Sequence, residues 1–511
     1  MLRGLGAPFR LLSIARTLAR HDALAPLQEL NIAPLPVTVA RMLSRRRAEG
    51  RPGQKLARAL TELGPAFIKL GQFLSTRSDL LGEQVAADLS DLQDRLAPFP
   101  GKEAREIVEA ELGAPATELF QVFEDEPVSA ASIAQVHLAV TSEGEEVAVK
   151  VLRPGVEAAF KRDLDLLYGL AEVVETTQPA LRRLQPVKAA QVFAEQTLFE
   201  MDLRMEAAAA AELAENFSGD PDYRLPPVDW ERSSRRVLTL GRLSGIPIDD
   251  RDALLEAGHD LEEVLRKAAT IFFQQVFRDG LFHGDQHPGN MFVDEAGNIG
   301  AVDFGIMGRL DWKTRSYLAD MMIAVLARDY RRLAEVHVDA GYLPPGKSLD
   351  AFGQALRAVC EPIFGRPLNE ISFARLLGQL FRLSESFDLE VQPQLLLLQK
   401  NMVMAEGISR RLMPELNIWT LAQPLIEQWM LENRGPEARL RDAAQDLAQV
   451  AERLPALVRN LDRASEDLAE GGLRLHPESA KALAGQNRSA AWHLRVIWAA
   501  LAILLLLVLL D

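Results

Sequence analysis

The chain has 511 residues, enough for two lobes with appendages rather than one small core. Its formal net charge of −15 disfavours nucleic acid as a partner, because the phosphate backbone is also negative. The single cysteine, Cys360, excludes an intrachain disulfide and a cysteine-based zinc cluster, which fits a reducing compartment.

The first twenty residues predict a basic amphipathic helix. Four arginines precede the first acidic residue, Asp22, and four apolar side chains share the opposite helical face: Leu11, Ile14, Ala15 and Leu18. This pattern is typical of a helix on an anionic membrane surface, and equally of a helix docked on the protein's own core. A transit peptide is a third interpretation.

Helical and extended patterns then succeed each other along the chain. Two short β-branched runs around Gly144 predict a hairpin over 133–151. The other predicted elements are helices over 54–97, 102–112, 158–217, 251–280 and 311–432, a strand over 237–243, and two short strands within 281–304. A small mixed lobe followed by a larger helical lobe is an α+β architecture and excludes an alternating βαβ design.

The C-terminal region differs from the rest. Leucines recur every seven residues between 433 and 475, and Pro455 interrupts them, so the segment predicts either a bent helix packed on the body or the stalk of a homodimer. Residues 496–510 are apolar throughout, and starting at Trp492 lengthens this run toward the ~30 Å of a bilayer core. We expect a transmembrane helix here, with Arg488 and Arg495 keeping the main domain on the cytoplasmic side.

The richest segment for chemistry is His283-Gly-Asp-Gln-His-Pro-Gly-Asn290, followed by Asp303-Phe304-Gly305. Phosphoryl transfer from ATP needs a carboxylate to orient the acceptor and oxygen ligands for Mg²⁺. Asp285 with Asn290 matches the base and metal ligand of a kinase catalytic loop, and Asp303 matches the metal-binding aspartate. His283 and His287 are either metal ligands or hydrogen-bonding residues of the loop, and we favour the second interpretation.

The phosphate side of the site lies earlier in the chain. Lys150 ends a Val-Ala-Val-Lys strand and matches the lysine that pairs with the α- and β-phosphates. Glu206, in helical sequence, is its predicted carboxylate partner. An alanine-rich segment replaces the glycine-rich loop, and alanine resists positive φ, so altered phosphate geometry is expected. This segment is Val128, Ser129, Ala130, Ala131, Ser132, Ile133, Ala134, Gln135 and Val136.

From about Leu56 to Trp429 the chain resembles the UbiB branch of the ABC1/ADCK/COQ8 atypical kinase family. The motifs that carry the resemblance are Lys69-Leu-Gly-Gln72, the alanine-rich segment, Lys150, the Glu200/Asp202 pair and the two catalytic segments described above. The resemblance implies that Lys69 and Gln72 project into the ATP pocket, that Lys69 meets Glu200 or Asp202, and that these helices cover the place where a protein substrate would enter. Leu240-Gly241 departs from the family's usual Met-Glu hinge.

The sequence patterns and the family resemblance together predict an α+β, two-lobed protein-kinase-like fold with an N-terminal helical extension and a C-terminal transmembrane helix. The predicted domains are 1–125 (helical extension), 126–245 (N-lobe), 246–432 (C-lobe), 433–490 (helical linker) and 491–511 (anchor).

Three functions stay open. The first, implied by the resemblance, is a kinase or ATPase at the bacterial inner membrane that binds ATP and Mg²⁺, supports ubiquinone biosynthesis, and meets biosynthetic enzymes or lipid-like quinone precursors. The others are a non-catalytic ATP-binding scaffold and a small-molecule kinase.

Overall fold

A computed structural model describes residues 7–23, 49–75, 83–90, 92, 96–177, 186–363, 379, 383, 386–389, 392–416, 424–425 and 429. The chain divides into two compact units, 1–429 and 430–511, and every described element belongs to the first. The predicted heptad segment and the apolar run 496–510 lie outside the described residues. Within the described residues, none of the helices combines the length and apolar character needed to cross a bilayer.

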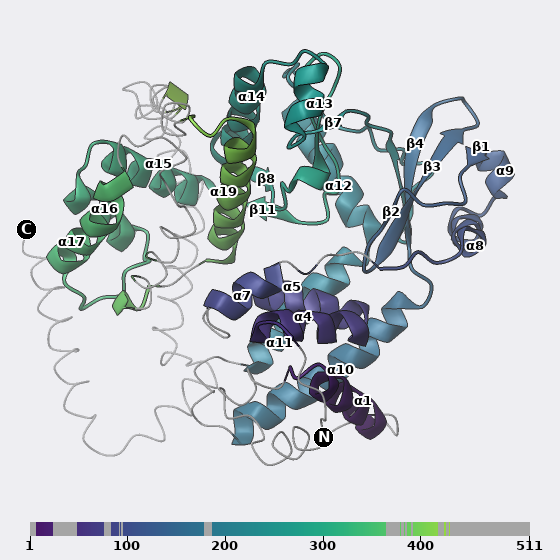
Figure 1. Cartoon of the computed structure of the whole chain (residues 1–511), viewed down its shortest axis with the longest axis horizontal. Helices are drawn as coiled ribbons and strands as arrows, with labels where there is room; N and C mark the ends of the chain where they lie inside the picture. The colour runs from purple at the N-terminus through teal and green to yellow at the C-terminus, as the bar shows by residue number, and fades with distance from the viewer. Residues whose placement is uncertain are drawn as a thin grey trace, which may run out of the picture. The chain divides into compact units, whose positions relative to one another are not determined.

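The smaller lobe is built on an antiparallel sheet with strand order β1-β3-β4-β6, and β2 pairs with β3 (Figure 1). The strands are β1 (Phe120–Phe123), β2 (Ser129–Ala130), β3 (Ala134–Thr141), β4 (Glu146–Leu152) and β6 (Val237–Gly241). Gly144 turns the β3–β4 hairpin at a φ of 94°, a conformation that suits glycine. The predicted hairpin and the strand after 237 are therefore confirmed.

One face of this sheet is covered by α8 (Gly101–Leu112), with α9 (Ala116–Leu119) at its edge (Figure 1). Ala104 and Val108 of α8 pack on Val149 and Val237, and all four are fully buried. Burying such side chains stabilises the lobe by roughly 1.5–3 kcal/mol for each valine. The resulting core fixes the sheet whose β4 strand carries Lys150.

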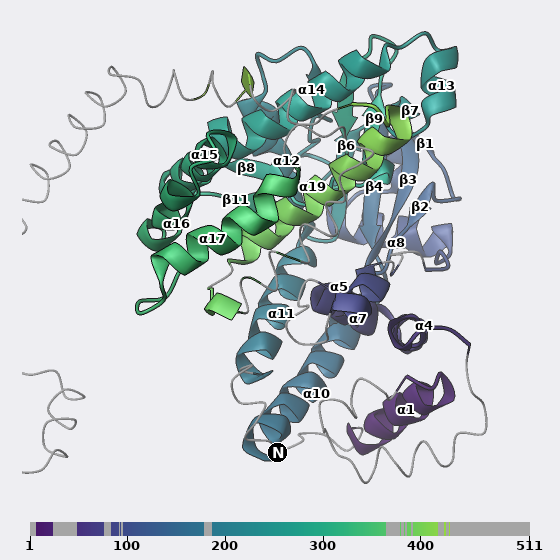
Figure 2. The ribbon, with the colours of Figure 1, turned by 60° about the vertical axis from the view of Figure 1, so that its left-hand side comes forward.

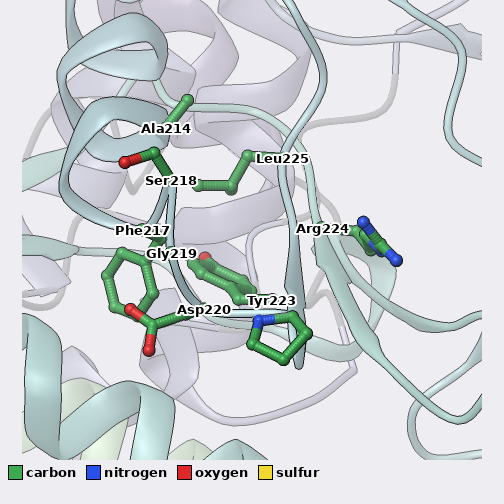
Figure 3. Close-up of a pocket in the computed structure, with 9 residues that line it drawn as sticks. Ala214, Phe217, Ser218, Gly219, Asp220, Tyr223, Arg224 and Leu225 are labelled. Atoms are coloured by element: carbon green, nitrogen blue, oxygen red, sulfur yellow. The ribbon is translucent and has the colours of Figure 1, made fainter.

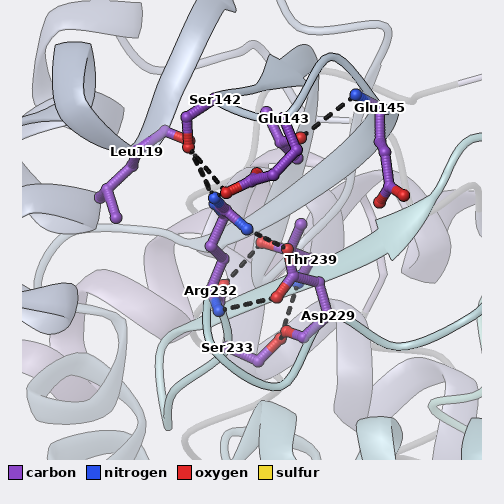
Figure 4. A network of polar contacts seen from close by, with 9 residues as sticks. Leu119, Ser142, Glu143, Glu145, Asp229, Arg232, Ser233 and Thr239 are labelled. Atoms are coloured by element: carbon purple, nitrogen blue, oxygen red, sulfur yellow. Dashed lines mark hydrogen bonds and ion pairs between the residues drawn. The ribbon is translucent and has the colours of Figure 1, made fainter.

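An arginine ties the tip of the hairpin to the segment before β6 (Figure 4). The Arg232 guanidinium donates to Glu143 at 2.6 Å, to Asp229 at 2.9 Å and to the Leu119 carbonyl at 3.0 Å. The hydrogen bond from Arg232 to Glu143 is the main reason that the pKa of Glu143 falls to about 2. The three partners come from three different segments, so the contact fixes their relative positions.

Further helices, from before β1 or from between β4 and β6 in the chain, pack on one another beside the sheet, and the last of them also contacts β6 (Figures 1 and 2). They are α1 (Ala7–Arg20), α4 (Pro52–Leu63), α5 (Pro65–Ser75), α7 (Glu83–Ser90), α10 (Val156–Thr177), α11 (Pro186–Glu200) and α12 (Leu203–Asn216). Helix α5 contacts α4, α7 and α10, and α10 packs along α11. Among the described residues, the predicted helical segment 54–97 holds α4, α5 and α7 and the segment 158–217 holds α10, α11 and α12, in place of one continuous helix each.

Helix α1 docks on the protein's own core. Ile14 is buried in the main hydrophobic cluster, and Arg10 donates to Asp163 at 2.9 Å and to the Leu63 carbonyl at 3.1 Å. Arg10 therefore lies on the docked face, and Ala15 is exposed, so the predicted division into an apolar and a basic face is wrong at these two positions. The interpretation of a docked helix is confirmed, and contact with lipid stays a prediction.

The larger lobe contains two small sheets and most of the remaining helices. One sheet has the order β5-β10-β9-β7 and the other pairs β8 with β11, a strand that the sequence pattern did not predict. The strands are β5 (Tyr223–Arg224), β7 (Ile246–Pro247), β8 (Leu281–His283), β9 (Met291–Val293), β10 (Ile299–Ala301) and β11 (Met307–Arg309). Gly308 allows this pairing, because a Cβ at that position would overlap the ring of Phe282.

Helices surround these sheets and mostly begin behind a capping aspartate or serine, such as Asp260, Asp311 and Ser348. They are α13 (Arg251–Glu256), α14 (Leu261–Phe273), the π-helix η2 (Gln274–Asp279), the short 3₁₀ helix η3 (Pro288–Asn290), α15 (Trp312–Leu326), α16 (Tyr330–Asp339), α17 (Leu349–Cys360), η4 (Glu361–Ile363) and α19 (Pro393–Leu412). Helix α19 contacts β11 and so runs beside the segment that follows β8 (Figure 2).

Candidate active site

The core of the site is an ion pair between the sheet and α12. Lys150 lies on β4 between Val136 of β3 and Leu238 of β6, so its backbone is held on both sides. Its Nζ is 2.7 Å from Oε1 and 2.9 Å from Oε2 of Glu206, in the first turn of α12. The predicted contact of these two residues is present, and both are largely removed from solvent.

Asp303 completes this cluster from the other lobe. Its Oδ1 lies 3.0 Å from the Nζ of Lys150, although 153 positions separate the two residues in the chain. The backbone of Asp303 has a φ of 62°, a left-handed conformation that costs a non-glycine residue about 1–3 kcal/mol. Asp tolerates this conformation better than branched residues do. The surrounding structure holds a strained residue at the place where the sequence predicts a metal ligand.

The charges of the cluster perturb one another. Lys150 is the main cause that lowers the pKa of Asp303, and the charge of Lys69 adds to it. Burial raises the pKa of Glu206 above its ordinary value, and the negative charge of Asp303 adds to this while Lys150 opposes it. Burial acts to lower the pKa of Lys150, but the two carboxylates outweigh it, so the lysine stays protonated.

The catalytic loop is ordered by its own histidines. The Nε2 of His283 lies 3.1 Å from the Val302 carbonyl, and its Nδ1 accepts from the backbone N–H of Asp285 at 3.1 Å. These contacts define a neutral tautomer, and burial lowers the pKa of this imidazole. His287 accepts from the N–H of Gly289 at 3.0 Å. Both histidines therefore act as hydrogen-bonding residues of the loop.

Asn290 joins the loop to the segment that carries Asp303. Its Nδ2 donates to the carbonyl of Asp285 at 3.1 Å, and its own carbonyl accepts from the N–H of Val302 at 3.0 Å. Through these contacts and the Lys150–Asp303 pair, the structure brings Lys150, Asp285, Asn290 and Asp303 into one region.

Known protein families match both lobes and the helices that follow. The model of the ABC1 atypical kinase-like domain matches residues 91–337, and the model of the UbiB helical domain matches residues 356–417. "Probable protein kinase UbiB" of Marinobacter nauticus is 43% identical over 458 residues, which are 88% of this chain and 83% of that protein. The protein of the same name from Pseudomonas aeruginosa PAO1 is 42% identical over 451 residues, covering 86% and 85%. The chain belongs to the UbiB family of ABC1 atypical kinases.

A solved structure supports the kinase-like fold of this UbiB-family chain. The structure titled as the complex of Rv3197 with erythromycin from Mycobacterium tuberculosis has a TM-score of 0.51 and 25% sequence identity. The matched region covers 72% of this chain and 93% of the chain in the solved structure. The mixed helix–sheet, kinase-like part of the predicted fold class is confirmed, and the predicted C-terminal transmembrane helix lies outside the described residues.

The Lys69–Gln72 motif lies on α5. Lys69 pairs with Glu200 at 2.9 Å, which is one of the two partners that the family resemblance implied. Asp202, the other, caps α12 and binds Arg204 instead. Gln72 is half-buried on the same helix. The charge of Lys69 also contributes to the lowered pKa of Asp303.

Gly71 explains why this motif contains a glycine. A Cβ at this position would overlap the side chains of Leu60 on α4 and Leu92. Glycine therefore lets α5, the helix that carries Lys69 and Gln72, approach α4 closely. The motif combines one packing residue with two polar residues.

The alanine-rich segment forms the β2–β3 corner. Ala131 donates to the Ala134 carbonyl at 2.8 Å, and none of residues 128–136 has a positive φ, as expected for alanine. Val128 and Ser129 are exposed and Ala130, Ala131 and Val136 are half-buried, whereas Ser132, Ile133, Ala134 and Gln135 are buried.

Gln135 requires a correction. Its amide bonds the backbone of Phe99 at 3.0 and 3.1 Å and the Nε2 of His137 at 2.8 Å, so its side chain has a structural role and is not a nucleotide ligand. The β-strand alternation of side chains turns it to the side opposite its neighbours.

The sequence reasoning missed a buried polar group beneath the catalytic loop. Gln275, in the π-helical segment η2, accepts from the N–H of His283 at 2.9 Å and donates to the hydroxyl of Tyr223 at 3.3 Å. A π-helical turn changes the direction in which side chains leave the helix, and such turns are frequent at functional sites. Nothing in the local sequence distinguishes η2 from the α-helix that precedes it.

Two residues of α19 were also missed, Lys400 and Asn401. The Nζ of Lys400 lies 2.8 Å from Oδ1 of Asp285, and Asn401 bonds the backbone of the catalytic loop. The available signal was a polar Gln-Lys-Asn triplet inside a leucine- and methionine-rich helix. Both residues belong to the segment that matches the UbiB helical domain.

An open pocket at the far end of α12 is separate from this site (Figure 3). It is lined by Ala214, Phe217, Asp220, Tyr223, Arg224 and neighbouring residues. Ala214 lies eight positions beyond Glu206 on the same helix, a rise of roughly 12 Å. Its lining includes no residue of the Lys150 cluster or of the catalytic loop.

Proposed function

We propose that this protein is a UbiB-type atypical kinase or ATPase that binds ATP with Mg²⁺ and supports ubiquinone biosynthesis. The observation that carries the proposal is the convergence of Lys150, Glu206 and Asp303 beside the loop that contains Asp285 and Asn290. The names of the UbiB relatives support the pathway.

The residues present fit a magnesium ion. Mg²⁺ is usually bound through one or two protein oxygens together with substrate phosphates and water. Asp303 offers an exposed carboxylate, and Asn290 offers its amide oxygen because its Nδ2 donates to Asp285. When bound there, Mg²⁺ would neutralise charge on the phosphates. Among the described residues, no group of three or more His, Cys, Asp or Glu side chains is placed to hold a metal.

Each protein residue has a role in this proposal. Lys150, held by Glu206, binds the α- and β-phosphates. The backbone of residues 128–136 covers these phosphates, and the side chain of Gln135 points away from them, toward the backbone of Phe99. Asp285 orients the attacking hydroxyl or water and accepts its proton. Lys69 and Gln72 on α5 restrict access, which favours water or a small lipid-like acceptor over a folded protein.

Asp285→Asn tests the proposed chemistry. The amide keeps the shape of the side chain but accepts no proton, so ATP turnover by the full chain should fall about 10²–10⁴-fold while the affinity for Mg-ATP changes little. Turnover would be measured by phosphate release and affinity by calorimetry. Equal turnover by Asp285→Asn and the wild type would contradict the assignment of Asp285.

The same variant separates an enzyme from a scaffold in cells. A strain that depends on this protein should make little ubiquinone when it carries Asp285→Asn, if turnover is required. Normal quinone levels with a variant that still binds ATP would favour the non-catalytic scaffold.

We further propose attachment to the bacterial inner membrane with the lobes on the cytoplasmic side. The apolar run 496–510 and the flanking Arg488 and Arg495 support this placement. It would bring the site to the surface where ubiquinone precursors and their enzymes reside.

A further inference from the structure

Lys400 brings a positive charge to the catalytic loop from a distant part of the chain. It lies on α19, 115 positions after Asp285, and its Nζ is 2.8 Å from Oδ1 of that carboxylate. The four residues between Asp285 and Asn290 are Gln, His, Pro and Gly, so the loop has no lysine or arginine of its own. Lys400 and Asp285 are both partly exposed, with side chains at 36% and 23% of full accessibility.

The adjacent residue fixes the register of α19 against the loop. Asn401 is almost fully buried, accepts from the N–H of Gln286 at 3.2 Å and donates to the carbonyl of His283. These bonds bracket Asp285 on both sides. They hold the helix in the position that presents Lys400, so this ion pair differs from a chance pairing of two surface side chains.

The position of Lys400 relative to Asp285 places it near the transferred phosphoryl group. A catalytic carboxylate lies about 2.6–3.2 Å from the oxygen whose proton it accepts. The ammonium of Lys400 is therefore within roughly 6 Å of that oxygen, and its flexible stem can reach further. In many phosphoryl-transfer enzymes, a cationic side chain from a distant part of the structure stabilises the negative charge on the oxygens of the transferred phosphoryl group.

We propose that Lys400 is a phosphate-binding residue of this site, which pairs with Asp285 before nucleotide binds and contacts the terminal phosphate of bound ATP. This inference rests on the proposed function and adds to it that α19 contributes a ligand for the phosphate. An ADP complex lacks the partner of this lysine, so Lys400 distinguishes the two nucleotides.

The test compares Lys400→Met with Lys347→Met in the full chain. Methionine keeps the length of the stem and removes the charge. Lys347 is the matched control, because its Nζ also forms an ion pair, 2.7 Å from Asp388, outside the site. Calorimetry with Mg²⁺ present measures the affinities for AMP-PNP and for ADP, and phosphate release measures ATP turnover.

Lys400→Met should weaken AMP-PNP binding about tenfold, the usual range for a lost hydrogen bond to a charged group, and leave ADP binding within about twofold. ATP turnover should fall at least as far as AMP-PNP affinity. Lys400→Arg should restore part of both, and Lys347→Met should match the wild type. Equal losses for AMP-PNP and ADP, or no loss for either, would overturn the proposal.

The outcomes also separate this inference from the proposed function. A wild-type protein that hydrolyses ATP, with a Lys400→Met variant that behaves identically, would sustain the proposed function and overturn the role of Lys400. If the wild type does not hydrolyse ATP, but Lys400→Met still weakens AMP-PNP binding selectively, the role of Lys400 would be sustained and the proposed function overturned. A wild-type protein that binds neither nucleotide would overturn both.

Discussion

Lys150 is shared by two carboxylates whose surroundings differ. Glu206 is buried beside it, and Asp303 reaches it from an exposed position at 3.0 Å. One ammonium group faces two carboxylates, so the cluster has an excess of negative charge, and burial together with the charge of Asp303 raises the pKa of Glu206. A cation bound at Asp303 would reduce this repulsion, which links metal binding to the strength of the Lys150–Glu206 pair.

Glu206→Gln tests the role of this pair. Lys150 would lose one charged partner and keep Asp303, so we expect nucleotide affinity to fall about tenfold and stability by about 1–3 kcal/mol. Calorimetry and thermal unfolding measure the two effects. Glu212→Gln is the control, because Glu212 lies further along α12 and forms an exposed ion pair with Arg309. Similar effects of both substitutions would contradict a special role for Glu206.

At the scale of elements, the small sheet depends on a neutral histidine. His137 of β3 is fully buried and stacks on Phe123. Its Nδ1 lies 2.7 Å from the Glu124 carbonyl, and its Nε2 lies 2.8 Å from the amide of Gln135. Burial lowers the pKa of His137, and the hydrogen bond to Glu124 opposes this only in part. The folded sheet therefore resists protonation at a position where the unfolded chain accepts a proton.

This difference predicts a loss of stability in mild acid. The unfolded state takes up a proton at His137 as the pH falls below the ordinary value of 6.5, and the folded state does not. Stability from this residue is complete above pH 6.5 and falls below it, by at most about 1.4 kcal/mol for each pH unit, until the lowered pKa of the folded state is reached. His137→Gln should make the melting temperature less dependent on pH between 6.5 and 5, whatever its effect at pH 8.

A second histidine supplies the control. His337 of α16 is also shifted to lower pKa by burial, so His337→Gln should reduce the slope independently and the double variant should reduce it further. Parallel pH profiles for His137→Gln and the wild type would contradict the account.

Local patterns predicted the elements that hold the site, and long-range packing decided the rest. The β-branched alternation of 133–151 and the position of Lys150 were readable because a hairpin is a local structure. The break between α11 and α12 was not readable, because it depends on distant contacts: Met201 is buried in the main core and the N–H of Leu203 donates to the Arg235 carbonyl. The docking of α1 through Arg10 and Asp163 also depends on a contact between residues 153 positions apart.

The candidate site shows the same division between local and distant information. Asp285, Asn290 and Asp303 were predicted from motif spacing, and Glu206 from its place in helical sequence. Lys400 was missed because its role depends on how α19 packs against the loop. The inward orientation of Gln135 was missed because a strand places successive side chains on opposite faces, and the motif gave no indication of which face meets the nucleotide.

At the scale of the whole molecule, the unit 1–429 contains the complete cluster, and the segment after it carries the predicted anchor. A chain that ends at residue 490 should move from the membrane fraction to the soluble fraction of cells, because it loses the apolar run 496–510. Fractionation with a carbonate wash measures this. Arg16→Glu tests α1 in the same assay, since Arg16 is exposed on that helix. Retention of the shortened chain in the washed membranes would contradict the anchor.

The central claim is that Lys150, Asp285, Asn290 and Asp303 surround a single metal-nucleotide. A crystal structure with AMP-PNP and Mg²⁺ tests it most directly. We expect Mg²⁺ bound by Asp303 and Asn290, the ammonium of Lys150 at the α- and β-phosphates, and a separation of Lys150 and Asp303 greater than the present 3.0 Å. A nucleotide bound elsewhere, with the Lys150–Asp303 contact unchanged, would contradict the account.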